Sequence, residues 1–205
     1  MKVLLINGSP HQNGCTARAL QEVATTLNKE NIETEIINVG HLAIRGCIAC
    51  GSCYKNGKCV FDDVVNEMAL KFKEADGLVI GSPVYYASAN GTLISFLDRL
   101  FYSSNFDKTM KVGASVVSAR RGGNSATFDE LNKYFTITSM PIASSQYWNQ
   151  VHGFTAADVE KDEEGLQTMR TLGRNMAFLI KSINLGKEKF GLPEKEPRKS
   201  THFIK

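Results

Sequence analysis

The sequence contains no hydrophobic run that is long enough to cross a membrane. Its first apolar run, Val3–Ile6, meets Asn7 after only four residues, which is too short for the core of a signal peptide. We therefore expect a cytoplasmic protein that does not associate with membranes. Because thiols stay reduced in that compartment, the five cysteines need an explanation other than disulfides.

A run of basic residues is also missing. The 24 Lys and Arg nearly balance the 21 Asp and Glu, which gives a net charge of +3. This charge distribution has no electrostatic footprint for nucleic acid, so we expect no nucleic-acid partner. The 205 residues are enough for one hydrophobic core. We predict a single domain over residues 1–185 and an extended tail over residues 186–205, where prolines and mixed charges follow one another.

Short apolar segments alternate with amphipathic segments through the predicted domain. The expected strands cover residues 3–6, 33–39, 78–80, 112–117 and 141–145. Helical spacing follows each of them, with Asp62 or Asp63 expected to cap one helix and Asn90 the next. The last helix is long and carries apolar residues from Leu166 to Ile180. This alternation predicts an α/β fold of three αβα layers around a parallel sheet.

The loop after the first strand, residues 8–16, has the composition of a phosphate site, and we call it the phosphate loop. Hydroxyl groups and free amides precede a helix amino terminus, whose partial positive charge favours an anion. The loop matches neither the dinucleotide pattern G-x-G-x-x-G nor the P-loop, so a monophosphate fits best. The alternative is a turn that only joins strand to helix. The candidate ligand contacts are Ser9, His11, Asn13, Gly14, Cys15 and Thr16. The same helix terminus is expected to lower the pKa of the Cys15 thiol, although a structural role is favoured over redox chemistry.

Two later loops have residues that suit a flat, partly anionic ligand. The first is rigid at its proline, allows close approach at its small residues, and carries two tyrosines that could stack on a ring or pack in the core. The second combines arginines with glycines, which offer positive charge and free amides. The candidates are Pro83, Val84, Tyr85, Tyr86, Ser118, Arg120, Arg121, Gly122 and Gly123.

At these three loops the sequence resembles the NADPH-dependent FMN reductase-like family, including its iron–sulfur flavoprotein branch. The motifs that carry the resemblance are Gly8-Ser9-Pro10, Gly14-Cys15-Thr16, Gly81 to Tyr86, Phe96 to Arg99, and Arg121-Gly122-Gly123. The resemblance implies a flavodoxin-like fold with five parallel strands in the order 2-1-3-4-5, and a homodimer or homotetramer. It also implies that the FMN phosphate binds the phosphate loop and that the flavin ring lies against the other two loops. The family often has Arg at the position of His11 and Asn at that of Cys15, so backbone amides are expected to bind more of the phosphate here.

Four of the five cysteines form a C-x2-C-x2-C-x5-C motif, which consists of Cys47, Cys50, Cys53 and Cys59. Three cysteines separated by two residues each resemble the ligand run of a [4Fe–4S] cluster. The iron–sulfur flavoprotein branch carries its cysteines at the same place, between the second strand and the next helix. Zinc also accepts four thiolates, and a third possibility is a metal-free loop that packs small thiols.

No Ser-His-Asp, paired-carboxylate or histidine–metal pattern is apparent, so we expect the flavin to perform the chemistry. NADPH or NADH would reduce bound FMN, and the electrons would pass to a small-molecule or protein acceptor. The alternative is an iron–sulfur flavoprotein or flavodoxin-like electron carrier that does not oxidise NAD(P)H itself. His152 is a candidate contact to flavin or substrate, or an ordinary packed or surface histidine. Asp98 and Arg99 could pair with each other or with a partner subunit, and a solvated or structural role is favoured over catalysis.

Overall fold

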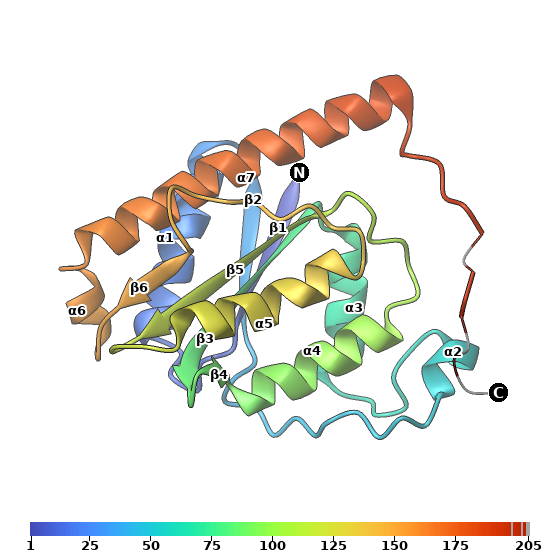
Figure 1. The fold of residues 1–205 in the computed structure, drawn as a ribbon, viewed down its shortest axis with the longest axis horizontal. Helices are drawn as coiled ribbons and strands as arrows, with labels where there is room; N and C mark the ends of the chain where they lie inside the picture. The colour runs from blue at the N-terminus through green and yellow to red at the C-terminus, as the bar shows by residue number, and fades with distance from the viewer. Residues whose placement is uncertain (198, 202, 204–205) are drawn as a thin grey trace.

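The computed structural model describes residues 1–197, 199–201 and 203. A parallel sheet runs through the middle of the molecule in the order β2-β1-β3-β5-β6 (Figure 1). Its strands are β1 (Lys2–Asn7), β2 (Glu33–Asn38), β3 (Gly77–Tyr85), β5 (Val112–Ala119) and β6 (Gln150–His152). A two-residue strand, β4 (Ser88–Ala89), pairs antiparallel with the end of β3. The parallel strands confirm the predicted order 2-1-3-4-5.

Helices cover both faces of the sheet, which confirms the three-layer architecture (Figure 1). One face carries α1 (Cys15–Lys29), α6 (Ala156–Val159) and α7 (Glu163–Phe190), and the other carries α3 (Val64–Glu74), α4 (Gly91–Ser103) and α5 (Asn124–Thr136). A short helix, α2 (Ser52–Asn56), lies against α4. None of the described helices combines the length and the apolar character needed to cross a bilayer.

Both faces of the sheet are buried, and the sequence of β1 shows why. Val3 and Leu5 point into the core under α1 and α7, whereas Leu4 and Ile6 point into the core under α3, α4 and α5. Each of these side chains is at most 1% exposed, and burial of one such side chain contributes about 1.5–3 kcal/mol. A strand with two buried faces therefore needs a continuous apolar run rather than an alternating one.

The predicted helix caps at Asp63 and Asn90 are present. The Asp63 carboxylate accepts a hydrogen bond from the amide of Val65 at 3.1 Å, and the Asn90 side chain accepts one from the amide of Thr92 at 2.7 Å. Each cap satisfies an amide that the first helical turn leaves without a partner. These caps fix where α3 and α4 begin, and α4 thereby starts directly after the hairpin of β3 and β4.

The fifth parallel strand is not at residues 141–145, as the sequence predicted. That segment makes only one bridge to the sheet, between Ile142 and Gly113, and the strand is β6 instead. Polar, exposed residues follow Ala143, and the Ser145 hydroxyl donates to the carbonyl of Tyr147 at 2.6 Å, which turns the chain away from β5. The chain returns to the sheet where Val151 is fully buried.

The predicted boundary at residue 185 lies inside a helix, because α7 continues to Phe190. Gly186 does not end the helix, since a glycine costs only about 1 kcal/mol within one. The helix ends at Gly191, whose φ of 75° is a conformation that glycine adopts without strain. Residues 192–197 have no regular structure, and positions 198, 202, 204 and 205 of the predicted tail lie outside the described residues.

Candidate functional site

The ends of β1, β3 and β5 meet at one cleft of about 860 Å³, which we call the strand-end cleft. Parallel strands place their carboxyl ends at one edge of the sheet, which is where ligands bind in open α/β folds. Eleven of the predicted ligand contacts line this cleft: Ser9, His11, Asn13, Gly14, Cys15, Thr16, Pro83, Val84, Tyr85, Ser118 and Arg120. Residues such as Thr16 and Ser118, which are 102 positions apart in the sequence, therefore surround the same space.

Hydrogen bonds between residues that are close in sequence fix the shape of the phosphate loop. The amide of Ser9 donates to the Asn7 side chain at 3.0 Å, and the amide of His11 donates to Ser9 Oγ at 3.1 Å. Thr16 Oγ1 and Ser118 Oγ lie 2.8 Å apart and share a hydrogen bond that joins the first turn of α1 to the end of β5. Ser9 Oγ accepts the His11 amide, so its own hydroxyl hydrogen stays available to donate to a ligand.

The amino terminus of α1 opens into the strand-end cleft without a side-chain cap. Its N-cap residue is Gly14, which has no side chain to accept from the first turn. Within the described part of the chain, the amides of Thr16 and Ala17 have no acceptor. Two open amides and the positive end of a helix dipole fit a phosphate group. The predicted emphasis on backbone amides agrees with this geometry.

The prediction for Cys15 is wrong in its direction. Burial raises the pKa of the Cys15 thiol above its ordinary value. The side chain is only partly exposed and packs against the core under α1, so desolvation outweighs the hydrogen bond from its own amide. Cys15 is therefore a packed thiol at the edge of the cleft, which agrees with the structural role that the sequence favoured.

Four predicted contacts lie outside the lining of the strand-end cleft: Tyr86, Arg121, Gly122 and Gly123. Tyr86 is fully exposed at the tip of the hairpin between β3 and β4, with a φ of 51°. Gly123 has a φ of 92°, and a side chain there would approach Ala87 and Val84 to 2.9 Å. Gly123 therefore allows α5 to pack closely against the hairpin and contributes to the cleft only through the placement of Val84.

His152 is next to the strand-end cleft but does not line it. It faces a smaller cavity of about 280 Å³ together with Trp148 and Asp162. Its amide donates to Asp162 Oδ2 at 2.6 Å, and its ring nitrogen Nδ1 is 3.7 Å from the same oxygen. Trp148 precedes β6. The role of His152 as a ligand contact stays a prediction.

The sequence did not indicate the part of the cleft that follows β6. Gly153, Phe154, Thr155 and Ala156 also line the cleft, next to α6, which packs against α1. Thr155 caps α6 and forms a capping box with Asp158, whose pKa is lowered by hydrogen bonds from Thr155 and Phe154. The signal was present in the sequence, because Thr155 and Asp158 have the spacing of a capping box. The signal was missed because the fifth strand was predicted at residues 141–145, so that residues 153–156 were not expected at the end of a strand.

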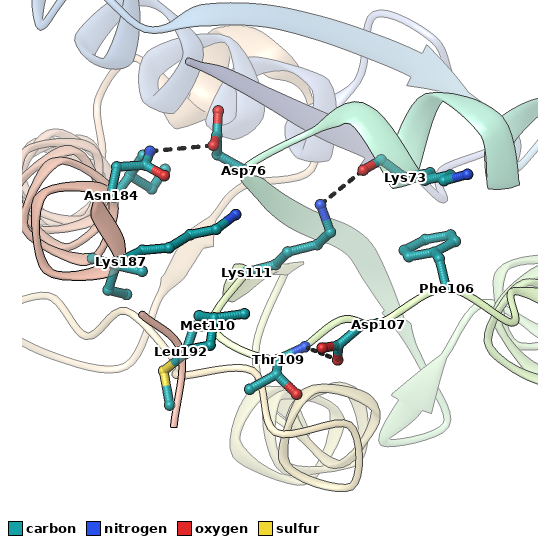
Figure 2. Close-up of a pocket in the computed structure, with 12 residues that line it drawn as sticks. Lys73, Asp76, Phe106, Asp107, Thr109, Met110, Lys111, Asn184, Lys187 and Leu192 are labelled. Atoms are coloured by element: carbon teal, nitrogen blue, oxygen red, sulfur yellow. Dashed lines mark hydrogen bonds between the residues drawn. The ribbon is translucent and has the colours of Figure 1, made fainter. Parts of the chain in front are cut away.

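Another cavity, of about 330 Å³, lies at the amino ends of β3 and β5, at the other end of the strands from the strand-end cleft, and Figure 2 shows its lining. Lys111 Nζ donates to the carbonyl of Lys73 at 2.9 Å, and Asn184 donates to Asp76 at 3.2 Å (Figure 2). The amide of Lys2 also donates to Asp76, at 2.8 Å. The protein itself thus satisfies the main polar groups here, unlike the open amides of the strand-end cleft.

The four motif cysteines line one cavity of about 400 Å³, which we call the cysteine cavity. Cys47 and Cys50 are exposed, and Cys53 and Cys59 are partly buried, and all four are free thiols. They are held by the segment between β2 and α3, in which α2 is the only regular element. Because all four thiols face one space, their chemistry fits a soft metal centre. Among the described residues, however, no three potential ligands are arranged closely enough to hold a metal ion.

Arg99 belongs to the cysteine cavity, and its partner is not Asp98, which was one of the two partners that the sequence suggested. Its guanidinium makes two hydrogen bonds of 2.8 Å to the Asp63 carboxylate, and its Nε lies 3.3 Å from the sulfur of Cys59. Asp98 instead accepts a hydrogen bond of 2.6 Å from the hydroxyl of Tyr134. Neighbouring residues on a helix point in different directions, which is why Asp98 and Arg99 have separate partners.

Solved structures with the same fold include a flavodoxin and an oxidoreductase. A flavodoxin from the domain Archaea is 16% identical and superposes with a TM-score of 0.60 over 88% of this chain and 99% of that one. An NAD(P)H:quinone oxidoreductase from Methanothermobacter marburgensis is 14% identical, with a TM-score of 0.67 over 86% and 96% of the two chains. At these identities the similarity establishes the flavodoxin-like fold.

Sequence comparison gives a more specific relationship. An iron–sulfur flavoprotein of Methanocaldococcus jannaschii is 35% identical over 191 residues, which cover 89% of this chain and 99% of that protein. The model of the NADPH-dependent FMN reductase family matches residues 1–154, a range that includes all three cleft loops and the four motif cysteines. The chain therefore belongs to the NADPH-dependent FMN reductase family.

Proposed function

We propose that this protein is an FMN-dependent oxidoreductase that takes electrons from NADPH or NADH and delivers them to a small-molecule or protein acceptor. The observation that carries the proposal is the convergence of three loops on the strand-end cleft, with the uncapped amino terminus of α1 at one end. Bound FMN would supply the redox chemistry by accepting a hydride. The protein needs only to bind, orient and tune it.

The phosphate would bind at the phosphate loop. Ser9 and Thr16 would donate their hydroxyl groups, and the amides of Thr16 and Ala17 would donate from the helix amino terminus. Both hydroxyl side chains are nearly fully buried, at 4% and 1% exposure. They therefore occupy defined positions before a ligand arrives, which reduces the entropy cost of binding.

The flavin ring would lie between the hairpin side of the cleft and the segment after β6. Pro83, Val84 and Tyr85 form one wall, and Phe154 is on the other. Tyr85 and Phe154 are 44% and 81% exposed, so both rings have apolar surface that a flat ligand could cover. Arg120 would place a positive charge beside the reduced, anionic flavin.

Rapid mixing of the FMN-loaded protein with NADPH, and separately with NADH, under anaerobic conditions tests the proposal. We expect the flavin absorbance to bleach within seconds with at least one donor, and the faster donor identifies the preference. The rival function is an electron carrier that a separate reductase must reduce. Flavin that stays oxidised for minutes with both donors, yet is reduced by dithionite, would establish the rival.

We propose further that the cysteine cavity holds a [4Fe–4S] cluster. The ligand spacing and the common cavity of the four thiols support this, and similar proteins carry the name iron–sulfur flavoprotein. Anaerobic purification followed by iron and sulfide analysis is the test, with equal amounts of both expected. Cys50→Ser should then lose the absorbance that exceeds the flavin bands. Zinc without sulfide, or no metal at all, would contradict the cluster and leave the FMN proposal intact.

We also propose that the protein forms a homodimer or homotetramer. Apolar side chains are exposed around the cysteine cavity, including Tyr54 at 79%, Val60 at 53% and Tyr102 at 61%. An apolar patch of this kind is typical of an interaction surface. Sedimentation of the FMN-loaded protein should give a mass of two or four chains, and a monomer that retains full NADPH oxidation would contradict the proposal.

A further inference from the structure

Arg99 is the largest fully buried side chain of the described residues, with only 1% of its surface exposed. Burying a guanidinium has a large desolvation cost, which proteins tolerate only where the charge is paired and hydrogen-bonded. Its main partner, Asp63, is itself 34% exposed and is already placed by its role as the cap of α3. A surface arginine could pair with such a carboxylate without being buried. The ion pair with Asp63 does not explain why Arg99 is buried, so its other contacts must.

Those contacts all go to the segment that carries the fourth motif cysteine. Arg99 Nε donates to the sulfur of Cys59 at 3.3 Å, and Nη1 donates to the carbonyl of Arg45 at 3.3 Å. The guanidinium also stacks over the ring of Phe61, at 5.1 Å from its centroid. One rigid, planar group thereby connects both ends of the cysteine segment to α4.

A second side chain holds the backbone of the same cysteine. The amide of Cys59 donates to Asn66 Oδ1 at 2.9 Å, and Asn66 Nδ2 donates back to the carbonyl of Cys59 at 3.1 Å. Asn66 lies on α3 and Arg99 on α4, so two helices fix this residue. Both the main chain and the sulfur of Cys59 therefore have defined positions.

The other three motif cysteines lack comparable support in the described part of the chain. The only hydrogen bond recorded for their sulfur atoms is from the amide of Ala49 to Cys47, at 3.4 Å, and it comes from within the same loop. Cys47 and Cys50 are exposed. Cys59 is thus held by side chains of α3 and α4, whereas Cys47 and Cys50 lie in irregular chain and Cys53 lies in the five-residue helix α2.

From this asymmetry we infer that Arg99 is a positioning residue, which presets Cys59 as the anchor ligand of the metal centre in the cysteine cavity. The inference rests on the proposed function, in which these thiols bind a metal centre. Arg99 fixes the sulfur before the metal arrives, and the other three cysteines close around it. Its N–H donor and positive charge also stabilise the electron-rich sulfur, which favours the reduced state of a bound cluster.

Cobalt(II) is a suitable probe, because the visible bands of thiolate-bound cobalt lie at longer wavelength than the flavin bands. The FMN-loaded protein, with its thiols reduced, is titrated with cobalt under anaerobic conditions as wild type, Arg99→Met and Cys59→Ser. We expect Arg99→Met to bind cobalt about 10- to 100-fold more weakly, as is usual when a partner of a metal ligand is lost. Its cobalt spectrum should resemble that of Cys59→Ser rather than that of wild type.

Arg45→Met is the matched control. Arg45 also stacks over Phe61, at 4.8 Å from its centroid, but its side chain is exposed, and among the described residues it donates no hydrogen bond to a motif sulfur. The substitution removes the same charge from the same ring, so cobalt affinity should stay close to that of wild type. If Arg99→Met does not retain FMN, Arg99→Lys takes its place, since it keeps the charge and loses the planar donor group. The same weakening is expected for it.

A second measurement separates positioning from general stability. After reconstitution with iron and sulfide, the midpoint potential of the cluster should fall in Arg99→Met and stay unchanged in Arg45→Met. Wild-type cobalt affinity and spectrum in Arg99→Met would overturn the inference, and so would a Cys59→Ser protein that binds cobalt as wild type does. Reduction of wild-type FMN by NADPH is measured separately, so a failure of the reductase proposal is recognised independently.

Discussion

The strand-end cleft and the cysteine cavity are built in different ways. The ends of three neighbouring strands and the segment after β6 form the cleft, and its open donors are backbone amides and two buried hydroxyl groups. The cysteine cavity is formed by a segment with one five-residue helix, and side chains of α3 and α4 hold one of its thiols. The topology of the sheet therefore fixes the first region, whereas individual side-chain contacts fix the second.

The largest expected effect tests whether the two regions are independent. Ser9→Ala combined with Thr16→Val removes two hydroxyl donors from the phosphate loop and leaves the side-chain volumes nearly unchanged. Each lost hydrogen bond to a charged group costs about 1.5–3 kcal/mol, so we expect the dissociation constant of FMN to rise roughly a hundredfold or more. Fluorescence titration of the apoprotein with FMN measures it.

Cys50→Ser is the matched control in the other region, because Cys50 is exposed and lies in the cysteine cavity. Its FMN affinity should equal that of wild type. Unchanged affinity in the double variant would refute the assignment of the phosphate to residues 8–16. A similar loss of FMN in Cys50→Ser would show that the two regions are coupled.

The same contrast explains how much of the molecule the sequence predicted. The continuous apolar run of β1 and the caps at Asp63 and Asn90 depend on neighbours in sequence, and they were found. The cleft followed from them, since parallel strands bring their carboxyl ends together whatever the side chains are. Eleven predicted contacts line it for that reason.

The missed features depend on contacts between distant residues. The fifth strand was placed at residues 141–145 because apolar content alone does not show where a chain leaves the sheet, and Phe154 was missed with it. Arg99 lies 40 positions from Cys59, and nothing in the spacing of the sequence indicates that they meet. An arginine in an amphipathic helix is usually exposed, so its burial required the structure.

Cys15 offers a pH-dependent test of the difference between the strand-end cleft and the cysteine cavity, with a smaller expected effect. Burial raises its pKa, and only the thiolate reacts with iodoacetamide, so labelling should be slow at pH 7. Below the pKa the thiolate fraction grows about tenfold per pH unit, and the rate should therefore keep rising through about pH 9. A variant with the four motif cysteines changed to Ser leaves Cys15 as the only thiol. A variant that retains only the exposed Cys50 is the comparison, and equal rates at pH 7 would contradict the burial of Cys15 in solution.

The smallest expected effect distinguishes two neighbouring arginines. Arg120 lines the strand-end cleft and Arg121 does not, although both are exposed. If reduced FMN lies beside Arg120, its positive charge stabilises the anionic form and raises the two-electron potential. An exposed charge contributes about 0.2–1 kcal/mol, so Arg120→Ala should lower the potential by about 5–20 mV, whereas Arg121→Ala should not change it. Spectroelectrochemical titration at low salt resolves a shift of this size, and raising the salt should reduce it by screening. Equal shifts in both variants would mean that the charge acts over a distance, and the ring would then lie further from this loop than the cleft geometry implies.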